Sequence, residues 1–241
     1  MFPLIKKEIT SFFSHPSGTI IIVSFLFANG VLMWLYPSDL NIIDSGFAQM
    51  DGLFTLSPFL FIVFIPALCM RLFSDEYKDG TIEILKTLPI STQKMVLGKY
   101  LSAVAIVFFA IVPSLIYVVS IFFLSDPIGN IDIAGTISSY LGLILLSAMF
   151  VSVGLFASST TSNQIVSLLI AILICSMFYF GFDLLARGFS HGFVQLFIEN
   201  IGADYHYRSL SKGVIDSRDI IYFVSLIVIF LQSTIFVTRE K

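Results

Sequence analysis

Long apolar stretches alternate with short polar ones along most of this chain. A helix needs about 20 apolar residues to cross a membrane core about 30 Å thick. Stretches of about that length occur at residues 19–36, 53–73, 96–124, 136–157, 165–186 and 220–237. The pattern predicts six transmembrane helices. Prolines inside the second and third stretches (Pro58, Pro66 and Pro113) are expected to bend them, which neighbouring helices tolerate in a membrane.

The composition supports the same fold class. Hydrophobic residues make up 57% of the chain and charged residues 12%, with a mean hydropathy of +0.96. Soluble domains carry about 25% charged residues, and no soluble fold of this size can bury so much apolar surface. We therefore predict an all-α integral membrane protein in which residues 1–241 form one transmembrane domain in the lipid bilayer. A net charge of −3 gives no reason to expect nucleic acid as a partner. Cys69 and Cys175 both lie in apolar runs, so we expect core thiols and no disulfide.

The distribution of Lys and Arg predicts the orientation. These residues gather before residue 19, within 71–99 and after 237, whereas segments 37–52 and 125–135 contain Asp but neither Lys nor Arg. Loops rich in Lys and Arg stay on the cytoplasmic side of a membrane. Both termini are therefore expected to be cytoplasmic, with residues 188–218 forming an outer loop.

Two segments outside the predicted spans are amphipathic. Residues 1–17 contain apolar Leu4, Ile9 and Phe12 beside Lys6, Lys7 and Glu8, as in a helix lying in the membrane interface. We interpret this segment as an interfacial helix, and the apolar run that follows it as an uncleaved first span. Apolar residues also recur from Phe193 to Ile201, which predicts a short helix on or in the outer leaflet.

The segment 74–95 has a density of charge that is unusual for this chain. Asp79 is expected to cap a helix that begins at Gly80–Thr81, and Pro89 to end it. Ser91 or Thr92 is then expected to cap the helix that continues into the third span. Two interpretations compete: a linker lying among lipid head groups, or a docking surface for another protein. The acidic residues favour docking, because an anionic membrane would repel them; they are Asp75, Glu76, Asp79 and Glu83.

The same segment carries a family resemblance. Residues 76–91, EYKDGTIEILKTLPIS, followed by Val96-Leu97-Gly98-Lys99, resemble the stretch after the second span in ABC-2 type permeases. Residues 208–223, RSLSKGVIDSRDIIYF, resemble the same family just before its last span. The N-terminal stretch and the overall length look most like the bacterial gliding-motility-associated permeases of the GldF type.

The resemblance implies a function. It implies a permease subunit in the bacterial cytoplasmic (inner) membrane that moves an unknown substrate outward when a separate ABC ATPase subunit hydrolyses ATP. It also implies a second permease subunit, as a homodimer or a paired membrane protein. ATPase coupling would fall on the matching positions of the cytoplasmic segment: Glu76, Gly80, Thr81, Glu83, Leu85, Leu88 and Pro89. An alternative is a non-transporting membrane anchor that passes ATPase-driven motion to a motility or secretion machine.

Sequence motifs for catalysis are missing. There is no G-x-x-x-x-G-K-[ST] phosphate loop, so we expect no cofactor in this chain, with ATP and Mg bound by the partner subunit. No metal-binding or hydrolase motif occurs, and we predict that the chain is not an enzyme. His206 stands among tyrosines and is interpreted as an interfacial residue.

Two further features have open alternatives. Asp183, with Arg187 four residues later, is either an ion pair near the outer end of the fifth span or a polar site for translocation. The fourth span carries a face of small residues, which packs either within the bundle or along a path or dimer seam. These residues are Gly142, Ser147, Ala148, Ser152, Gly154 and Ser158.

Overall fold

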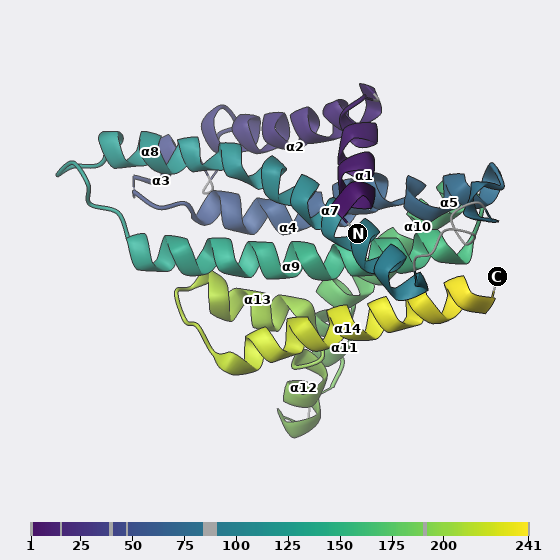
Figure 1. Cartoon of the computed structure of the whole chain (residues 1–241). Helices are drawn as coiled ribbons and strands as arrows, with labels where there is room; N and C mark the ends of the chain where they lie inside the picture. The colour runs from purple at the N-terminus through teal and green to yellow at the C-terminus, as the bar shows by residue number, and fades with distance from the viewer. Residues whose placement is uncertain are drawn as a thin grey trace.

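A computed structural model describes residues 2–14, 16–38, 41–46, 48–83, 91–189 and 192–240. Within these ranges the chain forms helices and no strand. The longest helices run side by side and form an elongated bundle (Figure 1). The predicted all-α fold is confirmed for the described part of the chain.

Within the described part of the chain, five helical bodies are long and apolar enough to cross a membrane: Asp51–Lys78, Thr92–Leu124, Ile133–Thr160, Gln164–Arg187 and Ser217–Glu240. A sixth candidate is a bent pair, Pro3–Ser14 and Gly18–Trp34, whose arms differ in direction by 71°. These arms belong to α1 (Phe2–Ser14) and α2 (Pro16–Trp34), which occupy the positions of the predicted interfacial helix and first span. Figure 1 shows α1 turned across the bundle while α2 runs along it.

The helix at the centre of the bundle is α9 (Ile133–Thr160). In the apolar 18-residue stretch of this helix, 78% of the residues are buried within the chain. In the corresponding stretches of Gln164–Arg187 and Ser217–Glu240 the buried share is only 22%. Its small residues explain why neighbours approach so closely. A Cβ atom on Gly154 would lie 2.7 Å from Cβ of Cys69, and one on Gly142 would lie 2.9 Å from Cβ of Leu210. The small face therefore packs within the bundle at these positions.

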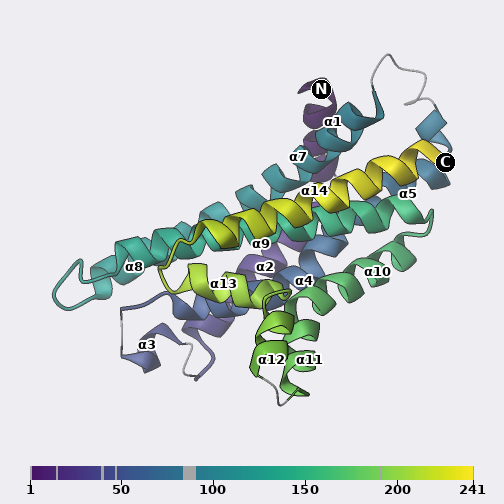
Figure 2. The same ribbon diagram turned by 90° about the horizontal axis from the view of Figure 1, so that it is seen from below.

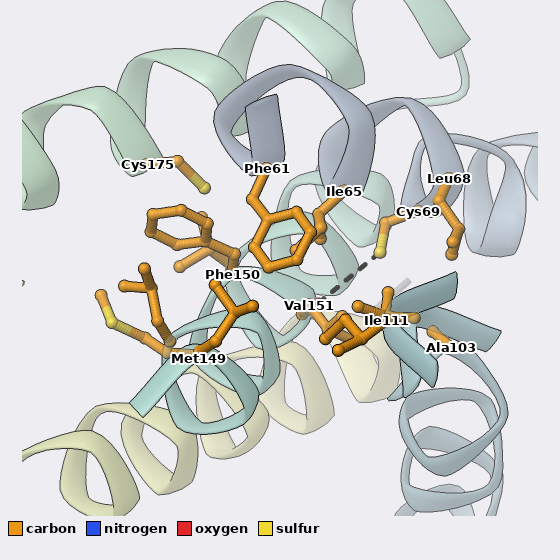
Figure 3. Packing of buried hydrophobic residues seen from close by; sticks show 14 of the residues in the cluster. Phe61, Ile65, Leu68, Cys69, Ala103, Ile111, Met149, Phe150, Val151 and Cys175 are labelled. Atoms are coloured by element: carbon orange, nitrogen blue, oxygen red, sulfur yellow. Dashed lines mark hydrogen bonds between the residues drawn. The ribbon is translucent and has the colours of Figure 1, made fainter. Parts of the chain in front are cut away.

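Side chains from α4 (Asp51–Cys69), α7 (Thr92–Ile111), α9 and α10 (Gln164–Ser176) fill the core. Figure 3 shows Phe61 and Ile65 of α4 facing Phe150 and Val151 of α9. The Sγ atom of Cys69 lies 3.9 Å from the carbonyl oxygen of Val151. Cys69 and Cys175 are both buried free thiols, as the sequence predicted.

The prolines act differently in the two spans that contain them. Pro58 and Pro66 remain inside α4, which is followed after Met70 by α5 (Arg71–Lys78). Pro113 lies in a turn of 3-10 helix, η1 (Val112–Ser114), which separates α7 from α8 (Leu115–Leu124). A proline lacks the N–H that a continuous helix uses, so the change of helix type at Pro113 has a direct cause.

The bundle has two distinct ends. What we call the terminal end carries α1, α5 and the end of α14 (Ser217–Glu240), close to the C-terminus (Figure 2). The opposite end, called the loop end, carries the short helices α3 (Ile42–Ser45) and α13 (Ala203–Ser211), while α12 (Gly192–Glu199) projects sideways from the bundle. Here α10 continues through a π-helical turn, η2 (Met177–Gly181), into α11 (Phe182–Arg187). The predicted short helix corresponds to α12, and α13 was not predicted.

Candidate functional site

Three elements of the terminal end meet at the side chain of Lys99. Its Nζ atom lies 2.8 Å from Oε1 of Glu76 on α5 and 3.1 Å from Oε1 of Glu8 on α1. It also donates a hydrogen bond of 2.7 Å to the carbonyl oxygen of Leu72. The Lys99 side chain is only 1% exposed. Since Lys99 belongs to α7, one buried ammonium group ties α7 to both α1 and α5.

Apolar packing closes this site around the charges. The ring of Phe73 lies below the ammonium group, with its centroid 5.1 Å from Nζ of Lys99. At the adjacent residue of α7, a Cβ atom on Gly98 would lie 2.8 Å from a methyl group of Leu4. The absence of a side chain at Gly98 therefore lets α1 lie directly against the backbone of α7.

Lys7 balances the charge of the cluster. Its Nζ atom is 3.7 Å from Glu8 and 3.8 Å from Glu76, and its side chain is 59% exposed. We call Lys7, Glu8, Glu76 and Lys99 the Lys99 junction. Two cations face two carboxylates, which is the condition under which buried charge is tolerated. Oε2 of Glu76 is buried without a hydrogen-bond partner among the described residues, so Lys99 is the main compensation for this carboxylate.

A second contact fastens α5 to the bundle core. The hydroxyl of Ser158 on α9 accepts hydrogen bonds from the backbone N–H groups of Phe73 (2.9 Å) and Ser74 (3.1 Å). It donates to the carbonyl oxygen of Met70 at 3.0 Å. One small residue of α9 thus satisfies backbone groups where α4 passes into α5.

Beyond α5 the chain turns sharply. Asp79 ends α5, donating its backbone N–H to the carbonyl oxygen of Asp75 at 2.8 Å. Gly80 follows with a φ of +68°, a left-handed conformation that favours glycine. Asp79 has a helical backbone conformation and closes one helix, so its predicted role as the cap of the next helix is wrong. The side chains of Thr81 and Glu83 are exposed after this turn.

The start of α7 agrees with the sequence. Ser91 has an extended backbone, and its hydroxyl accepts a hydrogen bond of 3.4 Å from the N–H of Lys94. The other predicted coupling residues, Leu85, Leu88 and Pro89, lie outside the described residues, as does the predicted end of the helix at Pro89. Of the predicted set, the structure thus brings Glu76 into the Lys99 junction and exposes Thr81 and Glu83 beyond the turn at Gly80.

Sequence reasoning missed Lys99 and Glu8 as members of one cluster. A signal was present in the spacing of α7, where Lys99 lies three residues after Val96, four before Ala103 and seven before Ile106. These three apolar residues are buried and share one helix face. A lysine on such a face requires an anionic partner.

The predicted polar pair of the fifth span lies at the loop end. Asp183 accepts a hydrogen bond of 2.7 Å from Arg187, one turn later on α11, and the Arg187 side chain is 66% exposed. The pair contributes nothing to the Lys99 junction, which is at the terminal end. It lines a cavity at its own end instead.

His206 is buried, so its interpretation as an interfacial residue is wrong. Its Nδ1 atom lies 2.7 Å from Oδ1 of Asp219 and its Nε2 atom 2.9 Å from the carbonyl oxygen of Asn200. The imidazole also stacks on Tyr222, with ring centroids 4.0 Å apart. These contacts fasten α13 to α14. Among the described residues, no group of three or more His, Cys, Asp or Glu side chains is placed to hold a metal ion.

A family of known proteins matches nearly the whole chain. Residues 3–237 match the model of a family described as ABC-2 family transporter protein. No curated protein matches the sequence.

Proposed function

The chain belongs to the ABC-2 family of transporter proteins, and on this premise we propose that its residues 79–91 form the contact for the ABC ATPase. Members of this family are multi-pass membrane transport subunits that act with a separate ATPase subunit. In this proposal the ATPase binds beside Thr81 and Glu83, and the Lys99 junction passes its motion into the membrane helices.

The observation that carries this proposal is the Lys99 junction. Residues 79–91 connect α5 directly to α7, and Lys99 joins both helices and α1 through contacts of 2.7–3.1 Å. A push on the segment therefore displaces α5, α7 and α1 together. Because Ser158 also fixes α5 to α9, the displacement reaches the helix at the centre of the bundle.

The exposed residues beyond Gly80 suit a protein partner. Thr81 and Glu83 are both exposed, and they follow the left-handed turn at Gly80 that ends the region of α5. In the proposed orientation this terminal end is cytoplasmic, where the ATPase binds ATP and Mg. The excess of Lys and Arg in segment 71–99 supports that orientation.

The finer features of the proposal rest on resemblance. We propose a bacterial inner-membrane exporter that works with a second permease subunit, either a copy of this chain or a paired membrane protein. The N-terminal stretch supports an association with gliding motility.

Co-purification from native membranes tests the proposed contact. A tagged chain is expected to retain an ABC ATPase and ATP hydrolysis through mild purification. Glu83→Lys reverses an exposed charge beside the turn and is expected to lower the recovered ATPase severalfold. Asp126→Lys is the matched control, since Asp126 is equally an exposed acid but lies at the loop end. Equal losses from the two variants, or no ATPase with the native chain, would refute the proposal.

A further inference from the structure

A cavity of about 770 Å³ opens at the loop end, at the opposite end of the bundle from the Lys99 junction. The start of α4, the start of α9, the η2–α11 region and α13 form its walls. Ligand pockets in proteins range from about 300 to 1,000 Å³, so a small molecule or a lipid head group fits this volume. Neither the proposed ATPase contact nor its coupling uses this cavity.

The charges around the cavity are mixed in sign. Carboxylates and cations both line it, and several of them already pair with one another. Asp183 pairs with Arg187 at 2.7 Å, and Asp204 pairs with Arg208. Three more charged side chains complete the lining: Asp51, Asp132 and Lys212. A near balance of charge favours a zwitterion over a simple anion or cation.

Aromatic and aliphatic side chains form the remaining wall. The π-helical turn η2 places both Tyr179 and Phe180 on the cavity, and such turns occur frequently at functional sites. The ring of Phe59 on α4 packs against both, with centroid distances of 5.9 Å to Tyr179 and 5.2 Å to Phe180. Phe59 is 47% exposed and Leu184 on α11 is 64% exposed, so this wall continues onto the apolar outer surface of the bundle.

The position of the cavity matches the head-group region of a membrane. Asp51 begins a candidate span, Arg187 ends another and Asp132 immediately precedes a third. Residues at the ends of membrane spans are where a bilayer changes from hydrocarbon to polar head groups, so these three positions suit contact with a lipid head group. A ligand that enters from the membrane meets Phe59 and Leu184 on the apolar surface and the charged residues at the end of the bundle.

We propose that this cavity binds the head group of a zwitterionic phospholipid that carries a primary amine, of the phosphatidylethanolamine class. Arg187 and Lys212 bind the phosphate, since guanidinium and ammonium groups are the usual partners of phosphate. Asp51 and Asp132 accept hydrogen bonds from the ammonium group, which has three donors. The acyl chains lie along Phe59 and Leu184.

Native mass spectrometry of the purified full chain with defined lipids tests this proposal. We expect phosphatidylethanolamine to be retained at least about fivefold over phosphatidylcholine, whose quaternary amine donates no hydrogen bond, and over phosphatidylglycerol, which lacks the cation. Equal retention of the three lipids would overturn the proposal without any variant.

Variants of the residues proposed to bind the phosphate provide a second test. Arg187→Gln with Lys212→Gln is expected to abolish the preference, because both phosphate partners lose their charge. Arg218→Gln is the matched control, since Arg218 lies at the same end but outside this cavity. Retention that falls equally in the control, or that survives in the double variant, would refute the assignment.

A soluble competitor distinguishes the two sources of this head group. Glycerophosphoethanolamine has the same phosphate and amine without acyl chains. Under the proposal it displaces the lipid only at a concentration at least about a hundredfold higher, because the apolar contacts of Phe59 and Leu184 are absent. Displacement at equal concentration would show a site for a soluble phosphoamine and would overturn the lipid assignment.

Discussion

The buried charge of Lys99 gives the sharpest quantitative prediction. Lys99→Met keeps the length and the apolar stem of the side chain but removes the ammonium group that Glu8 and Glu76 share at 3.1 and 2.8 Å. Both carboxylate side chains are only 12% exposed, so water replaces the lost partner poorly. Removing one member of a buried ion pair costs roughly 3–5 kcal/mol. We expect the free energy of unfolding of Lys99→Met to fall by about this amount.

The fully neutral combination separates charge from packing. In Glu8→Gln, Glu76→Gln, Lys99→Met no buried charge remains, because the ammonium group of Lys7 is on a side chain that is 59% exposed and is solvated by water. Replacing buried ionic partners by neutral groups is often close to neutral in stability. We therefore expect this triple variant to recover at least about 2 kcal/mol relative to Lys99→Met alone. Lys78→Met is the matched control, because Lys78 is exposed, and its cost is expected within about 0.5 kcal/mol.

Denaturant titration in mild detergent measures these differences. The fluorescence of the single tryptophan, Trp34, and the far-ultraviolet circular dichroism are followed together. A cost of Lys99→Met no larger than that of Lys78→Met would refute the account of the junction. A triple variant as unstable as Lys99→Met would show that lost packing, and not uncompensated charge, is the cause.

Three further predictions concern α9 and the loop end. Ser158→Ala leaves two backbone N–H groups of α5 without their acceptor and is expected to cost about 1–3 kcal/mol in the same titration; no measurable cost would contradict the contact. Gly154→Val forces a Cβ into Cys69 and is expected to cost about 1–3 kcal/mol, whereas Gly192→Ala, with open space around it, should cost less than about 1 kcal/mol. Burial raises the pKa of Asp204 above its ordinary value of 3.8. The folded state therefore holds this proton more tightly than the unfolded state. The contribution of Asp204 to stability is therefore greatest below pH 3.8 and falls as the pH rises through the raised pKa. Asp204→Asn should flatten this part of the plot of unfolding free energy against pH. A plot that is unchanged in Asp204→Asn would refute this prediction.

Helix positions followed from the sequence because lipid imposes a simple length rule. Each apolar stretch of about 20 residues corresponds to one helix or to helices that follow one another directly. Ser91 caps α7, since its hydroxyl can accept from one of the first free N–H groups of that helix. The small residues of α9 were identified as a packing face, but their partners were not. Only the folded chain shows that Gly154 meets Cys69 and that Gly142 meets Leu210.

The Lys99 junction could be predicted only in part. Glu76 was identified through a resemblance, whereas Lys99 and Glu8 are 91 residues apart and meet only because α1 turns back onto α7. His206 was misinterpreted for the same reason: its partner Asp219 lies on the next helix, 13 residues later. A periodic pattern predicts which face of a helix is buried, but it does not identify the element that covers that face.

The most direct test of the central claim is photo-crosslinking in native membranes. A crosslinker replaces Thr81, which is exposed beyond the turn at Gly80, and a second replaces Ile128, which is 70% exposed at the loop end. We predict that Thr81 captures an ABC ATPase subunit and that Ile128 does not. Capture of lipid alone from Thr81, or of the ATPase from Ile128, would contradict the proposed contact between residues 79–91 and the ATPase.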